Sequence, residues 1–573
     1  MRRPQGAAAA AAGIGVSRLS GLARTALITN ILGIGTIGDA FAAAMRIPNF
    51  LQNLLGEGAL SGAFVPAYSS LADRDERAAG QLAGAIATFL LTVTAAAALI
   101  SIFLARPLVR LIAWGFVGER YELTVSLVRI TVCATAVAVL SAWCLGVLNS
   151  HRRFFLSYVA PVLWNATQIA VLVGVLVWGV VGADRATALA WAVVAGAGAQ
   201  VLVQLRGVMR ANPSISLNFR WRERAASGVI RRFGPAVAGR GVLQISAFMD
   251  LALASLLSVG AAAAMAAAQT LYLLPLSLIG TSIAAAELTE LSRATDPRFV
   301  AHRTSDRLCA AVFGISGVVA VYFAAGRPLT DSMFNLAGFR NAIATDDLTL
   351  IALVLGAYSL GLGPLVASRL CQNVLFAARD TRTAAKIAAV RLAVSLAIGA
   401  ALMFPLDRVL VVDGALTGFG DIDLGSADST WSLIDADVRS DPALPARLGA
   451  VGLALGAAVG AWVELGLLRR AVLRRRRVLP SLPSRSDWPN QKLFGGKLLR
   501  HLVPAAVAFA VGLPTALVLD GLPAILRVIA TVALMAGLLA GCALGLRLDA
   551  ARAVASQVSR FLPLQRQDRG TPD

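Results

Sequence analysis

Long apolar stretches recur along the whole chain and are separated by short polar segments. An α-helix needs about 20 apolar residues to cross a bilayer. We predict fourteen membrane spans, over residues 7–32, 39–56, 82–105, 123–149, 154–181, 187–208, 234–258, 262–288, 307–325, 349–377, 384–404, 447–468, 499–519 and 524–546. No stretch alternates as the strands of a membrane barrel do. The pattern therefore predicts an all-α integral membrane protein.

The distribution of basic residues between the spans predicts their orientation. Arginine is frequent in HRR at 151–153, in the 209–233 loop with FRWRER, and in LRRAVLRRRR at 468–477. The 405–446 segment is instead dominated by aspartate. Because Lys and Arg are enriched in cytoplasmic loops, the arginine-rich segments are expected inside and 405–446 outside. An even number of spans then places both termini in the cytoplasm.

Two connecting segments are long enough to have structure of their own. The 405–446 segment combines turn residues with a few strand-like stretches, and predicts either a small ordered insertion or a flexible loop. Its aspartate spacing does not fit an EF-hand. Residues 469–498 are predicted to form a basic cytoplasmic connector that touches anionic lipid, and 547–573 a cytoplasmic tail.

Composition agrees with a helical bundle in lipid. The 573 residues are 57% hydrophobic and 15% charged, with a mean hydropathy of +0.72, whereas soluble domains are about 25% charged. The net charge of +20 could indicate nucleic-acid binding. The basic residues flank apolar spans, however, so anionic lipid headgroups are the expected partner and nucleic acid is not. The basic, alanine-rich N-terminus looks like a signal peptide, but its helical pattern continues through Leu32 and predicts a membrane helix.

The sequence has none of the common signatures of catalysis or metal binding. The cysteines lack CxxC spacing and the three histidines are scattered, so no metal site is expected. Walker, HExxH and GxSxG motifs are absent from the sequence. We therefore expect no cofactor, and a protein that moves a substrate rather than converts it. The cysteines are Cys133, Cys144, Cys309, Cys371 and Cys542.

Charged residues inside the first two spans are the strongest candidates for a functional site, because charge within a membrane usually faces a wet cavity. Arg18 lies about 17 Å along the first helix, and Arg24 follows it. Gly21 lies between them and permits close helix approach. Either arginine could instead pair with an acidic group or a carbonyl. Asp39 is expected to cap the second helix or to balance Arg18 or Arg24.

Polar residues in other spans extend the list of candidates. Arg240 and Gln244 share a face of the 234–258 span, and Asp250 lies deep in the same span. The sequence leaves open whether these groups line a cationic pore or pair between helices; for Glu57, a solvated interfacial charge is a further alternative. The candidates in the remaining spans are Arg46, Glu57, Glu287, Glu290, Arg369, Asn373 and Glu464.

Residues 17–71 resemble the N-terminal signature of the MurJ (MviN) family of lipid II flippases, which belongs to the MOP exporter superfamily. The matching motifs are SRxxGxxR at 17–24, DAF at 39–41, RIPN at 46–49 and EGALSGAFVP at 57–66. GPAVAGRGVLQIS at 234–246 and VLFAARDTRTAAKIA at 374–388 match more loosely. The landmarks extend to about residue 400.

The resemblance implies two pseudosymmetric six-helix lobes followed by two C-terminal helices that form a groove for a lipid tail. On this chain the regions would be the N-lobe 1–208, a cytoplasmic basic linker 209–233, the C-lobe 234–468 with the acidic insertion 405–446, the connector 469–498, the groove helices 499–546 and the tail 547–573. It further implies a monomer in the bacterial inner membrane.

The implied activity is translocation of lipid II, an undecaprenyl-pyrophosphate carrying a disaccharide-pentapeptide, to the outer leaflet by alternating access for cell wall synthesis. The family's essential arginines fall on Arg18 and Arg24, and their acidic partner on Asp39. The membrane potential or a coupling ion would drive the movement.

The chain departs from the family at three positions. Gln52 and Asn53 replace a basic pair, and Thr270 replaces an arginine. Arg46, Arg240 or Arg369 could compensate. Two alternatives therefore stay open. The chain could be a different exporter of the superfamily that moves an oligosaccharide-lipid, or a degenerate family member that acts as a membrane scaffold. The arginines argue against a cationic-drug antiporter.

Overall fold

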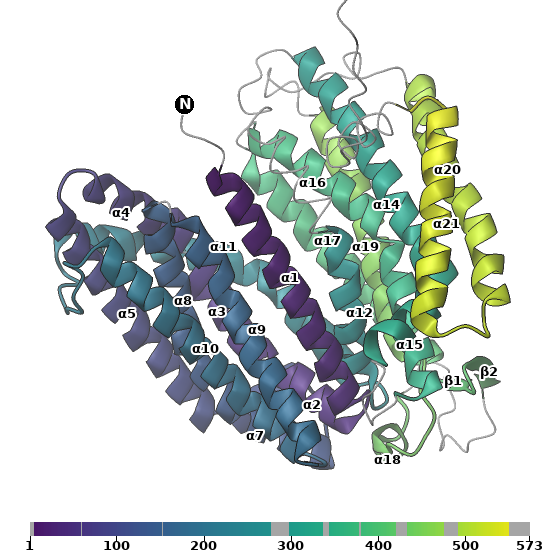
Figure 1. The fold of residues 1–573 in the computed structure, drawn as a ribbon, viewed down its shortest axis with the longest axis horizontal. Coiled ribbons are helices and arrows are strands. Elements are labelled where there is room, and N and C mark those ends of the chain that lie inside the picture. The colour runs from purple at the N-terminus through teal and green to yellow at the C-terminus, as the bar shows by residue number, and fades with distance from the viewer. Residues whose placement is uncertain are drawn as a thin grey trace, which may run out of the picture. The chain divides into compact units, whose positions relative to one another are not determined.

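Helices make up most of the computed structural model (Figure 1). The structure describes residues 5–58, 60–151, 153–276, 297–335, 343–377, 380–419, 433–474 and 491–548. Helix lies on each predicted span as far as the structure describes it. Ten helical segments in these residues are long and apolar enough to cross a membrane. The all-α membrane fold is therefore confirmed, while the number fourteen stays a prediction.

The chain divides into two compact units. Unit 1 comprises residues 1–267, 334–347 and 403–450, and unit 2 comprises residues 268–333, 348–402 and 451–573. The helices of unit 1 are α1 (Gln5–Leu32), α2 (Thr36–Ala44), α3 (Arg46–Gln52), η1 (Asn53–Gly58), η2 (Leu60–Phe64), α4 (Val65–Ala72), α5 (Glu76–Phe103), α6 (Ala105–Ile112), α7 (Gly118–Thr131), α8 (Cys133–Ser150), α9 (Phe154–Val177), α10 (Asp184–Ala211), α11 (Arg224–Ser255) and the start of α12 (Ala261–Pro275). These units differ from the lobes expected from the sequence, because α11 and the 405–446 insertion belong to unit 1.

Two predicted segments of unit 1 differ in detail from the structure. The 39–56 span is not one helix, since α2 ends at Ala44, α3 follows, and η1 and η2 are π-helical turns. α1, in contrast, continues without a break through both arginines, as predicted. The 209–233 linker is shorter than expected, because α10 reaches Ala211 and α11 begins at Arg224.

The linker packs directly on α5. A Cβ on Gly84 would lie 1.8 Å from the carbonyl oxygen of Ser216, so only glycine permits this approach. Asn212 Nδ2 donates to the Glu76 carbonyl at 3.1 Å, and Asn218 Nδ2 donates to the Gln81 carbonyl at 3.0 Å. The core beneath includes side chains of α4, α5, α8 and the π-helical turns, among which the largest fully buried are Trp143, Tyr68, Phe64 and Ile86.

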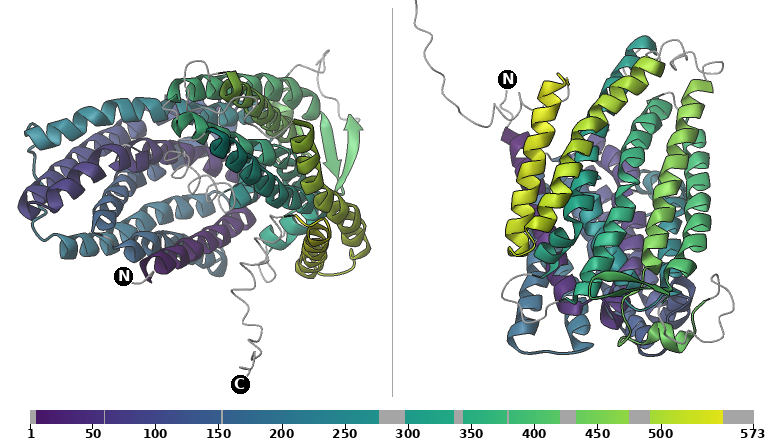
Figure 2. Two further views of the ribbon diagram at one scale, coloured as in Figure 1. Left: turned by 90° about the horizontal axis from the view of Figure 1, so that it is seen from above. Right: turned by 90° about the vertical axis from the view of Figure 1, so that its right-hand side faces the viewer.

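Small apolar cores pack the helices of unit 2 against one another. Val374, Leu375 and Leu468 form a small core between α16 (Leu362–Ala377), α17 (Thr381–Leu406) and α19 (Gly449–Arg474). Ala320, Ala508 and Met535 form another, which packs α20 (Gln491–Val518) and α21 (Ala524–Gly545) against α14 (Pro297–Phe334). The helices α20 and α21 lie side by side in Figure 2. The helices of unit 2 are the rest of α12, α14 (Pro297–Phe334), α15 (Thr345–Ser359), α16 (Leu362–Ala377), α17 (Thr381–Leu406), α19 (Gly449–Arg474), α20 (Gln491–Val518) and α21 (Ala524–Gly545).

The described parts of the 405–446 segment are an ordered insertion rather than a loop without structure. β1 (Val409–Val412) and β2 (Ala415–Phe419) form an antiparallel hairpin, and α18 (Ala436–Ser440) follows. Asp413 and Gly414 make the two-residue turn with φ values of 52° and 73°, as Asp-Gly does in tight hairpins.

Hydrogen bonds tie the insertion to the loop between α11 and α12. Asp407 accepts hydrogen bonds from the backbone N–H of Ser258 at 3.3 Å and from its hydroxyl at 3.1 Å. Arg439 Nη1 donates to the carbonyls of Ser255 and Leu256. These bonds explain why the insertion belongs to unit 1, although the sequence places it between helices of unit 2.

Burial raises the pKa of the Asp407 carboxyl from 3.8 to about 6, although Arg447 and Ser258 oppose the rise. Between pH 4 and 6 the folded chain therefore binds more protons here than the unfolded chain, and stability falls as pH rises through this window. We expect Asp407→Asn to remove this pH dependence and to raise the free energy of unfolding at pH 7 by up to about 3 kcal/mol. Denaturant unfolding in detergent across pH 4–8 measures it.

The control is Asp413→Asn, because Asp413 is exposed in the hairpin turn and Asn also tolerates the left-handed conformation. It should follow the native pH profile. An unchanged profile for Asp407→Asn would show that ionisation of this carboxyl costs no stability.

Candidate functional site

Arg24 occupies a built polar site between α1 and α9. Its Nη1 donates to Asn165 Oδ1 at 3.0 Å, and its guanidinium lies 4.9 Å from the centroid of the Trp164 ring. Asn165 is held in turn by donating from Nδ2 to Ser20 Oγ at 2.9 Å and to the Ser17 carbonyl at 3.3 Å. α1 packs along α9 in Figure 1.

The partners of Arg24 leave its charge available for an anion. Its bonded partner is a neutral amide, and no described carboxylate is bonded to it. Its Nε is buried and has no hydrogen-bond partner within the described structure. A planar guanidinium with an unused donor suits a phosphate oxygen. The site therefore matches anion binding better than internal charge pairing.

Gly21 and Arg18 lie on the same helix as Arg24. A Cβ on Gly21 would lie 3.6 Å from Asn165 Nδ2, which is ordinary contact, so Gly21 lies directly beside the partner of Arg24. Arg18 is exposed. Gly21 therefore borders the Arg24 site, whereas Arg18 is an exposed side chain six residues earlier on the same helix.

Asp39 lies elsewhere and has a different role from either expectation. Its carboxylate is fully buried and accepts the backbone N–H groups of Gly260 at 2.9 Å and Ala263 at 2.8 Å. Arg120 Nη1 donates to it at 3.1 Å. The first N–H groups of a helix lack partners within that helix, and Asp39 supplies an acceptor for those at the start of α12.

The two expectations for Asp39 are therefore corrected. The residue at the N-cap of α2 is Gly35, and Asp39 lies inside that helix. Its ionic partner is Arg120 rather than Arg18 or Arg24. One buried arginine and two backbone N–H donors replace the water molecules that would otherwise hydrate this carboxylate.

Arg120 is a residue that sequence reasoning missed. It is 2% exposed, its Nη2 donates to the Ser255 carbonyl at 3.3 Å, and it lies over the Phe116 ring at 4.2 Å. In the sequence it precedes the 123–149 span within GERYEL, where an arginine reads as a solvated loop charge. Only its contacts identify it.

A small pocket brings two further candidates together. Arg46 from α3 and Asp250 from α11 line it with Ala42, Ala254 and Met265, and its empty space is about 230 Å³ with open solvent included. Opposite charges from two helices therefore border one cavity within unit 1.

The remaining candidates do not join this group. Arg369 is exposed on α16 in unit 2. Glu464 is buried in unit 2, where it accepts hydrogen bonds from Gln372 at 3.0 Å and from Arg391 at 3.4 Å. Inter-helix pairing, one of the two alternatives, is thus what the structure has for Glu464. The side chains of Glu57, Arg240 and Gln244, and all of Glu287 and Glu290, lie outside the described residues.

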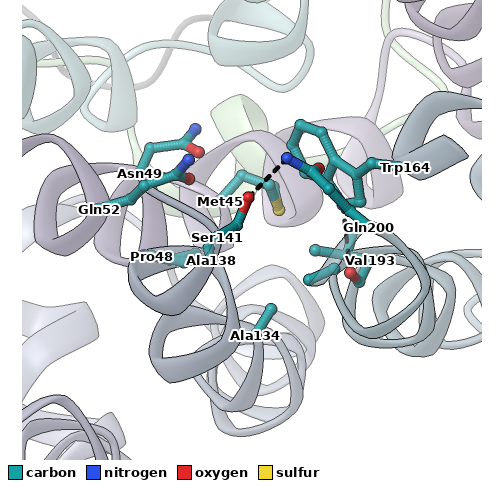
Figure 3. A pocket seen from close by; sticks show the side chains of 11 residues that line it. Met45, Pro48, Asn49, Gln52, Ala134, Ala138, Ser141, Trp164, Val193 and Gln200 are labelled. Atoms are coloured by element: carbon teal, nitrogen blue, oxygen red, sulfur yellow. Dashed lines mark hydrogen bonds between the residues drawn. The ribbon is translucent and has the colours of Figure 1, made fainter. Parts of the chain in front are cut away.

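A larger pocket opens between α3, α8, α9 and α10 (Figure 3). Its empty space is about 420 Å³ with open solvent included. Gln52 lies in its wall, on the same helix as Asn49, and faces Trp164 across the space. Gln200 Nε2 donates to Ser141 Oγ at 2.7 Å, the bond drawn in the figure. The Arg24 guanidinium lies over the Trp164 ring, so the side chain of Trp164 borders both the pocket and this cation.

Comparison with known proteins places this geometry in a family. The family model described as lipid II flippase MurJ matches residues 28–413. A protein from Rhizobium tropici named probable lipid II flippase MurJ is 30% identical over 421 residues, which are 70% of this chain and 76% of that protein. The lipid II flippase MurJ of Burkholderia cenocepacia is 32% identical over 385 residues, 65% of this chain and 73% of that protein.

The chain belongs to the lipid II flippase MurJ family.

Solved structures agree on the fold. A lipid II flippase MurJ in an inward closed conformation has a TM-score of 0.66 at 18% identity, covering 92% of this chain and 97% of that one. An inward-facing multidrug resistance MATE transporter of the MOP superfamily has a TM-score of 0.56 at 15% identity, covering 79% and 94%. The MurJ family consists of multi-pass transporters of the bacterial inner membrane rather than enzymes.

The buried pair of Asp39 and Arg120 predicts strong coupling in this MurJ family member. Removing one partner strands a buried charge and costs about 3–5 kcal/mol. We expect Asp39→Asn and Arg120→Met each to lower the unfolding temperature markedly, and the double variant to lower it by much less than their sum. Thermal unfolding in detergent measures this cycle.

The matched control is Arg106 and Glu122, whose charges meet at 2.9 Å with both side chains about half exposed. That pair should show a coupling below about 1 kcal/mol. Additive losses at Asp39 and Arg120 would show that the buried contact stabilises nothing.

Proposed function

We propose that this protein moves lipid II from the cytoplasmic to the outer leaflet by alternating access and thereby serves cell wall synthesis. Membership of the MurJ family supports the substrate. The observation that carries the proposal within this chain is the half-buried Arg24 side chain, whose bonded partner is neutral and whose buried Nε has no partner in the described structure. A pyrophosphate is the lipid II group that such a site fits.

In the proposed mechanism the pyrophosphate enters a wet cavity and binds Arg24 with help from Arg18. The polyprenyl tail stays in lipid beside α20 and α21. Asp39 and Arg120 hold the start of α12, on the side that we predict to be extracytoplasmic. Opening outward then requires them to release α12, and this replaces the pairing of Asp39 with Arg18 or Arg24 that was expected from the sequence.

The membrane potential can drive this movement. An inside-negative potential favours outward movement of an anion by about 2.3 kcal/mol per charge per 100 mV. A pyrophosphate with about two negative charges needs no ATP on this scale. A coupling ion is the alternative driving force. We further propose cytoplasmic termini, a monomer, and anionic lipids as neighbours of the basic loops.

A second candidate is an exporter of a different lipid-linked oligosaccharide. The neutral Gln52 in the pocket wall, where a cation was expected from the family, favours it. Both candidates require a cationic first helix, whereas a membrane scaffold does not.

Complementation of a conditional lipid II flippase mutant tests the proposal. The native chain should restore growth, whereas Arg18→Ala and Arg24→Ala at matched membrane levels should not. Arg24→Lys should restore growth only in part, because an ammonium lacks the planar fork that holds Asn165 and phosphate together. Cleavage of lipid II by an enzyme added outside the cell gives a direct readout of its arrival in the outer leaflet.

Arg210→Ala is the control, because Arg210 is an exposed arginine at the end of α10, and it should behave as the native chain. A native chain that inserts but neither restores growth nor delivers lipid II outside would exclude this substrate. Rescue by Arg24→Ala would remove the proposed role of that residue.

A further inference from the structure

The pocket in Figure 3 has no charge in its wall. Of the eleven described residues that line it, none is ionisable, and its polar groups are two carboxamides of α3, one of α10, a hydroxyl and an indole. Ala134, Ala138 and Ala197 supply a small apolar surface beside them. A site of this composition suits a neutral ligand that combines hydrogen-bonding groups with a small apolar group.

Some of the polar groups are engaged and others are available. Ser141 donates to Gln204 Oε1 at 2.7 Å and accepts from Gln200 Nε2 at 2.7 Å, so its hydroxyl proton is already engaged. The side chains of Asn49 and Gln52 make no hydrogen bond within the described part of the chain. Two adjacent carboxamides can therefore both donate to a ligand carbonyl and accept from a ligand N–H.

Trp164 connects this neutral pocket to the cationic site. Its Nε1 donates to the Val193 carbonyl at 3.2 Å, which holds the ring in the pocket wall. The Arg24 guanidinium lies 4.9 Å from the centroid of the same ring. A ligand that fills both places must therefore carry a neutral amide close to an anion.

A 2-acetamido sugar 1-pyrophosphate has this arrangement, because its amide and its anion are on adjacent ring carbons. The acetamido methyl matches the alanines, and its carbonyl and N–H match Asn49 and Gln52. We propose that this pocket binds the N-acetyl group of the lipid-proximal aminosugar while Arg24 binds the pyrophosphate. The inference rests on the proposed function and assigns Gln52 a positive role, in which a neutral amide selects the acyl group.

Binding of two synthetic lipids to the full-length protein in phospholipid nanodiscs tests the proposal. One lipid is a polyprenyl-pyrophosphoryl N-acetyl aminosugar, and the other has a hydroxyl in place of the acetamido group, so both have the same charge. The native chain should bind the acetamido lipid about tenfold more tightly, the value of one to two net hydrogen bonds. Ala138→Leu, which fills the pocket, and Gln52→Leu, which removes an amide, should each reduce this ratio to about two or below.

Ala195→Leu is the matched control, because Ala195 is exposed on α10 and is not in the pocket wall; it should keep the native ratio. Gln52→Leu keeps the test valid if Ala138→Leu does not fold. Equal binding of both lipids by the native chain would overturn the inference and leave the proposed function standing. A preference that survives both pocket variants would also overturn it, whereas failure to bind either lipid would remove the proposed function as well.

Discussion

Burial of the Asp39 carboxylate is a constraint on which the arrangement of unit 1 depends. An isolated carboxylate in a low-dielectric interior is very costly unless it is paired and hydrogen-bonded. Here the compensation comes from Arg120 on α7 and from two N–H groups at the start of α12. Three segments far apart in the chain must therefore lie together wherever this charge is buried.

The same loop that Asp39 and Arg120 hold is also held from the insertion. Ser255 accepts from both Arg120 and Arg439, and Ser258 donates to Asp407. The connection between α11 and α12 is therefore fixed by polar contacts from two directions. This explains why the insertion is ordered in its described parts, although its composition alone also allowed a flexible loop.

Arg24 differs from Asp39, because its hydrogen-bond partner is neutral whereas Asp39 pairs with an arginine. Its partners are an amide and an indole face, neither of which neutralises it. A guanidinium held in this way has a fixed orientation and keeps its positive charge. Recognition of a mobile anion requires both. The pocket lined by Trp164 and by residues of α3, α8 and α10 adds hydrogen-bonding groups that carry no charge. The neutral Gln52, where the resemblance predicts a basic residue, is compatible with function, since it changes which part of a ligand this wall can recognise.

Hydropathy determined the helices of this protein, because a run of apolar residues is a local property of the chain. Most of the apolar spans could be located in this way, the charges of Arg18 and Arg24 could be read directly within the first of them, and the motifs at 17–71 carried the resemblance to MurJ. The 405–446 segment was expected to be either an ordered insertion or a flexible loop, although Asp-Gly at 413–414 is a common hairpin turn. The ionic and hydrogen-bond partners of Asp39 could not be read from the sequence, because Arg120 lies 81 positions away along the chain and Ala263 lies 224 positions away. Such contacts, like the pocket assembled from four helices, depend on which helix faces meet, and only the tertiary structure decides that.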